Sequence, residues 1–171
     1  MRVPGDKITM IPYGADLVEN ADPSLLYPYG LTPGGYAIVV ARPEPENSIL
    51  EIVGAFSTKT RNLKLVVLGK YSPNESPYQK SVMGAASSEV LFPGAVYEKS
   101  IIQSLRFHAR LYIHGHKVGG TNPSLVEALG VGSAVLAQDN KFNRWVARKG
   151  AHYFSGEEWR LLLRNAEDSQ V

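Results

Sequence analysis

Short runs of aliphatic residues recur along the chain, and most are followed by apolar residues at helical spacing. The runs are apolar throughout rather than alternating, which is typical of strands buried on both faces. Strands are expected at 8–11, 36–41, 65–69, 90–92, 111–113, 134–137 and 152–154. Helices are expected at 49–56, 75–86, 99–106 and 142–149, from Pro123 onward, and around Trp159, Leu162 and Leu163 near the end. Trp145 and Val146 are expected in the core.

Alternating strands and helices predict an α/β domain with a doubly wound, Rossmann-like parallel sheet and helices on both faces. A length of 171 residues fits a single domain that spans residues 1–171. Such sheets bind ligands beyond the carboxyl ends of their strands, in the loops that lead into helices. The functional residues are therefore expected in those loops.

The composition excludes several classes of protein. The chain has no cysteine, which excludes disulfide frameworks, thiolate zinc sites and cysteine nucleophiles. A net charge of +2 does not indicate a nucleic-acid partner. No apolar run approaches a membrane span, and no secretory signal opens the sequence, so we expect a cytoplasmic protein without a transmembrane segment.

One stretch departs from this balance of charge. Between Lys99 and Gln138 the only carboxylate is Glu127, while four lysines and arginines supply positive charge and three histidines are able to add to it. Its centre, 115–130, is a glycine-rich turn that leaves a strand and enters a helix. Asn122 suits the N-cap and Pro123 the first helical position. Free N–H groups at a helix start and glycines that permit close approach together form an anion site.

Glu127 lies five residues beyond the cap, about 7 Å along the helix axis. Its neighbours are apolar, so we expect a partly buried carboxylate that binds a pair of ligand hydroxyls, such as those of a ribose. The alternative is that Asn122 and Pro123 only cap a helix and that Glu127 is a solvated face residue. His114 and His116 do not make a metal site, because zinc needs at least three protein ligands; one of these rings lining the ligand site is the favoured interpretation.

The stretch 119–132 and the strand after it resemble the donor-binding signature of retaining glycosyltransferases of family 4, which have the GT-B fold. Three further motifs occur in the same order: 8–16 is similar to the start of the C-terminal domain, 41–47 to a loop that carries an arginine, and 91–96 to a loop that contacts the base. The resemblance covers residues 8–156. The variants at 42–47 and 114–128 are most similar to a bacterial subgroup of rhamnosyltransferases.

The resemblance implies a role for each matching residue. Glu127 holds the ribose hydroxyls, and Arg42 neutralises the diphosphate; a surface ion pair of Arg42 with Glu44 or Glu46 is the alternative. The other donor-binding candidates are Asn47, Gly119, Gly120, Thr121, Asn122, Pro123 and Ser124. Base-binding candidates are Phe92, Gly94, Ala95 and Val96, and sugar-site candidates are His116 and Lys117.

Two positions depart from the family pattern. Gly119 stands where relatives have a first glutamate that grips the transferred sugar. Where many relatives have a lysine after the arginine, this chain has Glu46 and Asn47, so that charge is absent or supplied elsewhere, with Lys117 as a candidate. A deoxysugar donor needs no carboxylate at that site, so the absence of the first glutamate is consistent with such a donor.

The implied function is the donor domain of a metal-independent, retaining glycosyltransferase of bacterial polysaccharide or glycan assembly, without cofactor and with no catalytic residue assigned in this chain. The implied partners are a nucleotide-sugar, an N-terminal acceptor-binding domain and a glycan or lipid-linked acceptor, with peripheral association at the inner membrane face through that domain. We expect the isolated chain to bind nucleotide without transferring a hexose. The alternatives are half of a sugar-nucleotide epimerase and a non-catalytic, regulatory nucleotide-binding module.

Overall fold

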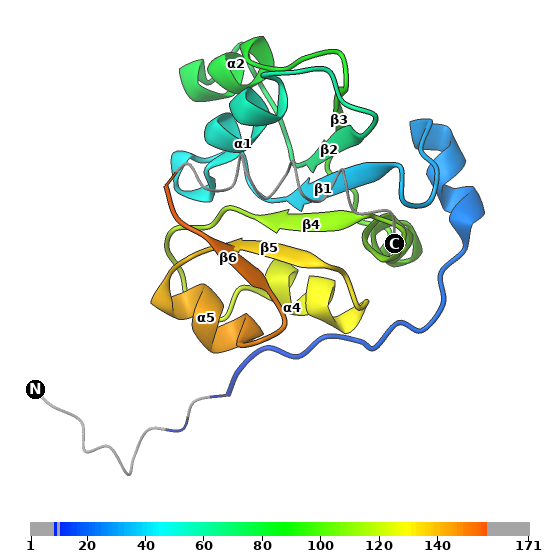
Figure 1. The fold of residues 1–171 in the computed structure, drawn as a ribbon, viewed down its shortest axis with the longest axis vertical. Coiled ribbons are helices and arrows are strands. Elements are labelled where there is room, and N and C mark those ends of the chain that lie inside the picture. The colour runs from blue at the N-terminus through cyan, green and yellow to red at the C-terminus, as the bar shows by residue number, and fades with distance from the viewer. Residues whose placement is uncertain (1–8, 10, 157–171) are drawn as a thin grey trace, which may run out of the picture.

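All strands of the central sheet run parallel. The computed structural model describes residue 9 and residues 11–156. In this part of the chain, six strands lie in the order β3-β2-β1-β4-β5-β6 (Figure 1). Their bounds are β1 Tyr36–Val40, β2 Lys64–Leu68, β3 Val90–Gly94, β4 Leu111–His114, β5 Val135–Gln138 and β6 His152–Phe154. This order, with parallel pairing throughout, confirms the Rossmann-like α/β fold predicted from the pattern.

The helices follow the strands as predicted. They are α1 Ile49–Phe56, α2 Pro77–Gly84, α3 Lys99–Phe107, α4 Pro123–Gly130 and α5 Lys141–Ala147. Two 3-10 helices, η2 Pro23–Tyr29 and η3 Pro45–Asn47, were not predicted. Each begins with a proline, which suits the first helical position, but neither has the apolar periodicity by which the longer helices were found.

Alternate residues of each strand pack into two separate cores. Ala37 and Val39 of β1 face a core that includes α1 and α2, whereas Tyr36 and Ile38 face one that includes η2 and α3 to α5. The same alternation holds along β2. Helices therefore cover both faces of the sheet, which explains why its strands are apolar at every position.

Three sequence predictions differ from the structure or fall outside it. Thr9 and Ile11 are not in a strand, because nothing in the described sheet pairs with them; Ile8, Met10 and the predicted last helix lie outside the described residues. Residues 11–22 form a coil that runs along α4, where the Val18 N–H donates to the Gly130 carbonyl at 3.0 Å (Figure 1). Trp145 is 44% exposed, since α5 buries Asn143 and Ala147 instead.

Candidate functional site

A cavity of about 800 Å³ opens at the carboxyl ends of four neighbouring strands. Most of its wall comes from the segments that follow β1, β2, β3 and β4, and Ile102 of α3 also lines it. The cavity includes the boundary between β1 and β4, where the order of the strands reverses. Open α/β sheets bind ligands at such a boundary, because the loops on its two sides diverge to opposite faces. We call this space the donor cavity.

The loop after β1 places an unpaired cation on the wall of this cavity. Arg42 is exposed, and no described residue forms an ion pair with it. This excludes the ion pair with Glu44 or Glu46 that was the alternative interpretation of Arg42. The amide of Asn47, which is buried, donates to the Arg42 carbonyl at 2.8 Å. Asn47 therefore lines the cavity and also fixes the backbone that carries Arg42.

The loops after β1 and β4 are in close contact. A side-chain carbon on Gly115 would lie 2.4 Å from the Asn47 carbonyl, so only glycine fits there. The Ser48 hydroxyl donates to the Gly115 carbonyl at 2.8 Å, and the Lys117 N–H donates to the Glu46 carbonyl at 2.8 Å. These contacts hold two of the cavity walls in one arrangement.

The start of α4 presents backbone N–H groups to the donor cavity. Asn122 is the N-cap and Pro123 the first helical residue, as predicted, although the Asn122 side chain makes no capping hydrogen bond. The N–H groups of residues 119–122 and of Ser124 have no acceptor within the described residues. Gly119 has φ of +140°, which glycine adopts without strain. Unbonded amides at the positive end of a helix favour an anion.

Ser124 anchors this end of α4 to the sheet. Its hydroxyl donates to the Val40 carbonyl at 3.0 Å and also contacts the Tyr112 hydroxyl. The first turn of α4 is thereby tied to β1 and to β4, the two strands at the boundary. The predicted donor residues Arg42, Asn47 and 119–124 all line the one cavity.

His114 and His116 form part of a column of rings along β4 and the loop beyond it. Their ring centroids are 4.2 Å apart and the rings are nearly parallel, with Tyr112 stacked on the other side of His114. Burial and the nearby Arg42 lower the pKa of His116 to about 4, and burial lowers the pKa of His114 well below its ordinary value. The expectation that these two histidines add positive charge is therefore wrong at neutral pH.

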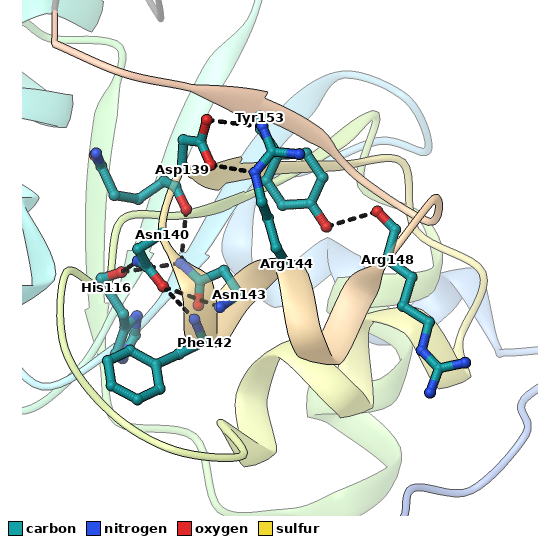
Figure 2. A network of polar contacts seen from close by, with 9 residues as sticks. His116, Asp139, Asn140, Phe142, Asn143, Arg144, Arg148 and Tyr153 are labelled. Carbon is teal, nitrogen blue, oxygen red and sulfur yellow. Dashed lines mark hydrogen bonds and ion pairs between the residues drawn. The ribbon is translucent and has the colours of Figure 1, made fainter.

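The backbone of His116 is fixed from the α5 side. Figure 2 shows the side-chain amides of Asn140 and Asn143 converging on the His116 carbonyl, at 2.9 and 3.0 Å. Asn143 is buried and also donates to the Gln138 carbonyl at 2.8 Å. His116 thus enters the wall of the donor cavity as a neutral ring on a fixed backbone.

Lys117 does not line the donor cavity, whereas Lys70 does. The Lys117 ammonium forms an ion pair with Glu51 at 2.9 Å and lines a different, smaller cavity. Lys70, just beyond β2, lines the donor cavity and has no ion pair among the described residues. Sequence reasoning missed Lys70, although its place after a strand end was a usable signal.

The loop after β3 contributes only part of the predicted base-binding set. Ala95 and Val96 line the donor cavity, whereas Phe92 packs edge-on against Tyr71 with ring centroids 5.0 Å apart. Gly94 does not line the cavity either. Tyr97, which was not predicted, lines the cavity with a side chain that is 87% exposed. An exposed aromatic ring beside a cavity is a surface on which a planar group stacks.

Glu127 does not line the donor cavity. Its carboxylate forms an ion pair with Arg106 of α3 at 2.6 Å and is 46% exposed. It faces a neighbouring cavity of about 400 Å³, which is lined by α3, by residues 14–16 of the coil and by Glu127 and Val131 at α4. We call it the α3–α4 cavity. The carboxylate is partly buried, as expected. Its partner within the described residues is Arg106, which was not foreseen because it lies on a different helix.

No group of three or more histidine, aspartate or glutamate side chains able to hold a metal ion occurs within the described part of the chain. Nor does any helix in that part combine the length and apolar character needed to cross a membrane.

Solved structures resemble this one closely in backbone. A search with family models and a search of curated proteins found no match to the sequence. The C-terminal domain of the glycosyltransferase LpcC from Francisella tularensis superposes with a TM-score of 0.68 at 18% identity, covering 90% of this chain and 85% of that one. HepE from Anabaena, solved with UDP and glucose, gives 0.67 at 17%, covering 85% and 41%. WaaG, a glycosyltransferase of lipopolysaccharide biosynthesis, gives 0.74 at 17%, covering 97% and 49%.

The chain has the fold of a GT-B glycosyltransferase domain. It spans less than half the length of HepE and WaaG, but most of the separate LpcC domain. At these identities the likeness concerns the glycosyltransferase fold alone.

Proposed function

We propose that the donor cavity binds a nucleoside-diphosphate sugar and that the chain is the donor domain of a retaining, metal-independent glycosyltransferase. One observation carries this proposal: the unbonded amides at the start of α4 and the unpaired Arg42 line one cavity at the strand-order boundary. Both kinds of group are donors without acceptors, which is the arrangement that a diphosphate requires. The resemblance in fold to HepE, whose structure holds UDP and glucose, supports the same ligand class.

The proposed chemistry is electrostatic. When the bond between the sugar and the diphosphate breaks, negative charge grows on the leaving phosphate oxygens. The α4 amides, Arg42 and Lys70 are positioned to stabilise that charge without reorganising, and they take the part that a divalent metal plays in other transferases. The chain then supplies the leaving-group half of the reaction, and a second domain supplies the acceptor.

The finer assignments extend the same proposal. Glu127 holds the ribose and His116 faces the sugar. Ala95 and Val96 contact the base, with Phe92 and Gly94 of β3 directly before them. With Gly119 in place of a carboxylate, a deoxyhexose such as rhamnose is the proposed sugar, transferred in bacterial polysaccharide assembly at the cytoplasmic face of the membrane. WaaG, of similar fold, acts in lipopolysaccharide biosynthesis, which supports this setting.

A ligand screen tests the proposal. Thermal unfolding of the chain is followed with pyrophosphate and with the diphosphates of uridine, guanosine, adenosine and thymidine, in EDTA. A ligand that binds only the folded state raises the melting temperature by mass action. At 100 times its Kd, such a ligand adds about 2.7 kcal/mol to the free energy of unfolding. We expect at least one nucleotide and pyrophosphate to stabilise the chain without metal. If none does so at millimolar concentration, the proposal is wrong.

A further inference from the structure

Arg106 is a buried cation that the proposed donor cavity does not use. Its side chain is only 5% exposed, although it lies on α3 among groups that line the α3–α4 cavity. One terminal nitrogen, Nη2, is 2.6 Å from Oε2 of Glu127, and Nε is buried without a hydrogen-bond partner among the described residues. A guanidinium in this position is costly to desolvate unless it is paired and hydrogen-bonded.

Because the Arg106 side chain is buried, few groups lie within reach of its charge. Glu127 is the one carboxylate among the described residues that forms an ion pair with it. The Ser133 hydroxyl donates to the Arg106 carbonyl at 3.2 Å, which joins α3 to the turn after α4. Since the arginine is buried and the glutamate is half exposed, the arginine is the fixed partner and determines the orientation of the carboxylate.

The α3–α4 cavity adjoins the donor cavity. Ile102 lines both, and it lies one helical turn before Arg106 on α3. On α4, Ser124 lines the donor cavity and Glu127, three residues later, lines the α3–α4 cavity. Three residues rise about 4.5 Å along a helix, so the two cavities open onto adjacent turns of α4.

We propose that Arg106 is a positioning residue for ribose recognition: it holds Oε2 of Glu127 so that Oε1 faces the α3–α4 cavity and accepts hydrogen bonds from the ribose hydroxyls of the donor. This rests on the proposed function. Oε1 has no partner among the described residues, so it remains available to a ligand. A neutral hydroxyl is the fitting ligand, because the charge of the carboxylate is already balanced by the arginine.

The test measures the contribution of the hydroxyls separately from that of the phosphates. Calorimetry gives the Kd of a ribonucleoside diphosphate, of its 2′,3′-dideoxy form and of pyrophosphate, using whichever of the uridine, guanosine and adenosine diphosphates binds best in the screen. The ratio of the dideoxy Kd to the ribose Kd is expected to be about tenfold in the natural chain, as for a hydrogen bond to a charged group. Arg106→Met keeps the aliphatic bulk but removes the charge, and Arg110→Met, at an exposed arginine that lines neither cavity, is the matched control.

We expect Arg106→Met to bring the ratio close to one, and Glu127→Gln, which keeps a neutral acceptor oxygen, to lower it at least threefold. Their Kd for pyrophosphate and the ratio in Arg110→Met should stay unchanged. If Arg106→Met does not unfold cooperatively, Arg106→Lys takes its place, with the ratio expected to fall at least threefold. A normal ratio in the arginine variant beside a lowered ratio in Glu127→Gln overturns the inference, as does a pyrophosphate Kd that weakens in parallel. If the natural chain binds neither pyrophosphate nor nucleotide, the proposed function fails instead.

Discussion

The donor cavity and the α3–α4 cavity share Ile102, but the charged groups are unpaired in the first and paired in the second. In the donor cavity, Arg42 and Lys70 have no ion-pair partner among the described residues, and the amides at the start of α4 have no acceptor. In the α3–α4 cavity, Arg106 is paired with Glu127, and Lys99 with Asp16 at 2.7 Å.

This difference indicates which chemical groups each cavity favours. Unsatisfied donors gain most from an anion, whereas a carboxylate already balanced by an arginine gains little from a cation and suits neutral hydroxyls. A nucleotide has both kinds of group, one after the other. The two cavities together therefore suit the ligand that we propose, a phosphate next to a ribose.

The largest effect is expected from Arg42→Ala. If Arg42 contacts the phosphate as proposed, removing this cation should weaken both pyrophosphate and nucleoside diphosphate by about 30-fold, because a hydrogen bond between charged groups is lost. Calorimetry at fixed ionic strength measures both affinities, with Arg110→Ala as the control. Equal binding by Arg42→Ala and the natural chain would remove Arg42 from the site.

Glu127→Ala acts on the other cavity. We expect nucleoside-diphosphate affinity to fall at least tenfold, since the ribose hydroxyls lose a charged acceptor, while pyrophosphate binds as before. Glu98→Ala, at the exposed start of α3, serves as the control. A parallel loss of pyrophosphate affinity would instead mean that the variant disturbs the start of α4, and the distinction between the cavities would fail.

The fold and most of the donor-cavity wall were predictable from sequence because they depend on local signals. Apolar runs located the strands, and Asn122 with Pro123 located the start of α4. Because parallel strands have their carboxyl ends at the same edge of the sheet, Arg42 and residues 119–124 could be placed together at that edge. These are properties of short segments and of the order of elements.

What was missed depends on contacts between distant segments. Nothing in the sequence around Glu127 indicates Arg106, which lies on the preceding helix, or shows that Lys117 pairs with Glu51. The neutral state of His114 and His116 follows from burial, which a sequence reports poorly for histidine. Phe92 was placed at the base by resemblance, but its ring packs against Tyr71.

The neutral histidines predict a pH effect on stability rather than on charge in the donor cavity. Because the pKa of His116 is about 4 in the folded chain and about 6.5 when unfolded, the unfolded state binds more protons between these values. Stability is complete above pH 6.5 and falls as the pH drops toward 4. His116 should contribute a loss of about 1 kcal/mol between pH 7.5 and 5.5.

Urea unfolding at several pH values checks this. His116→Phe retains a ring to stack on His114 but does not titrate, so its free energy of unfolding should fall less steeply with acid than that of the natural chain. His152→Phe, at an exposed position on β6, should retain the natural slope. Identical slopes for His116→Phe and the natural chain would contradict the buried neutral state.

The smallest effects compare two lysines and bear most directly on which charges serve the donor cavity. Lys70→Ala should weaken pyrophosphate binding by about threefold, as for one exposed charge in high dielectric. Lys117→Ala should leave it unchanged, because the Lys117 ammonium is already neutralised by Glu51 and lines a different cavity. Calorimetry with pyrophosphate measures both in the same buffer. The reverse order, with Lys117→Ala the weaker binder, would mean that Lys117 leaves Glu51 when an anion binds and supplies the charge that is absent at Asn47.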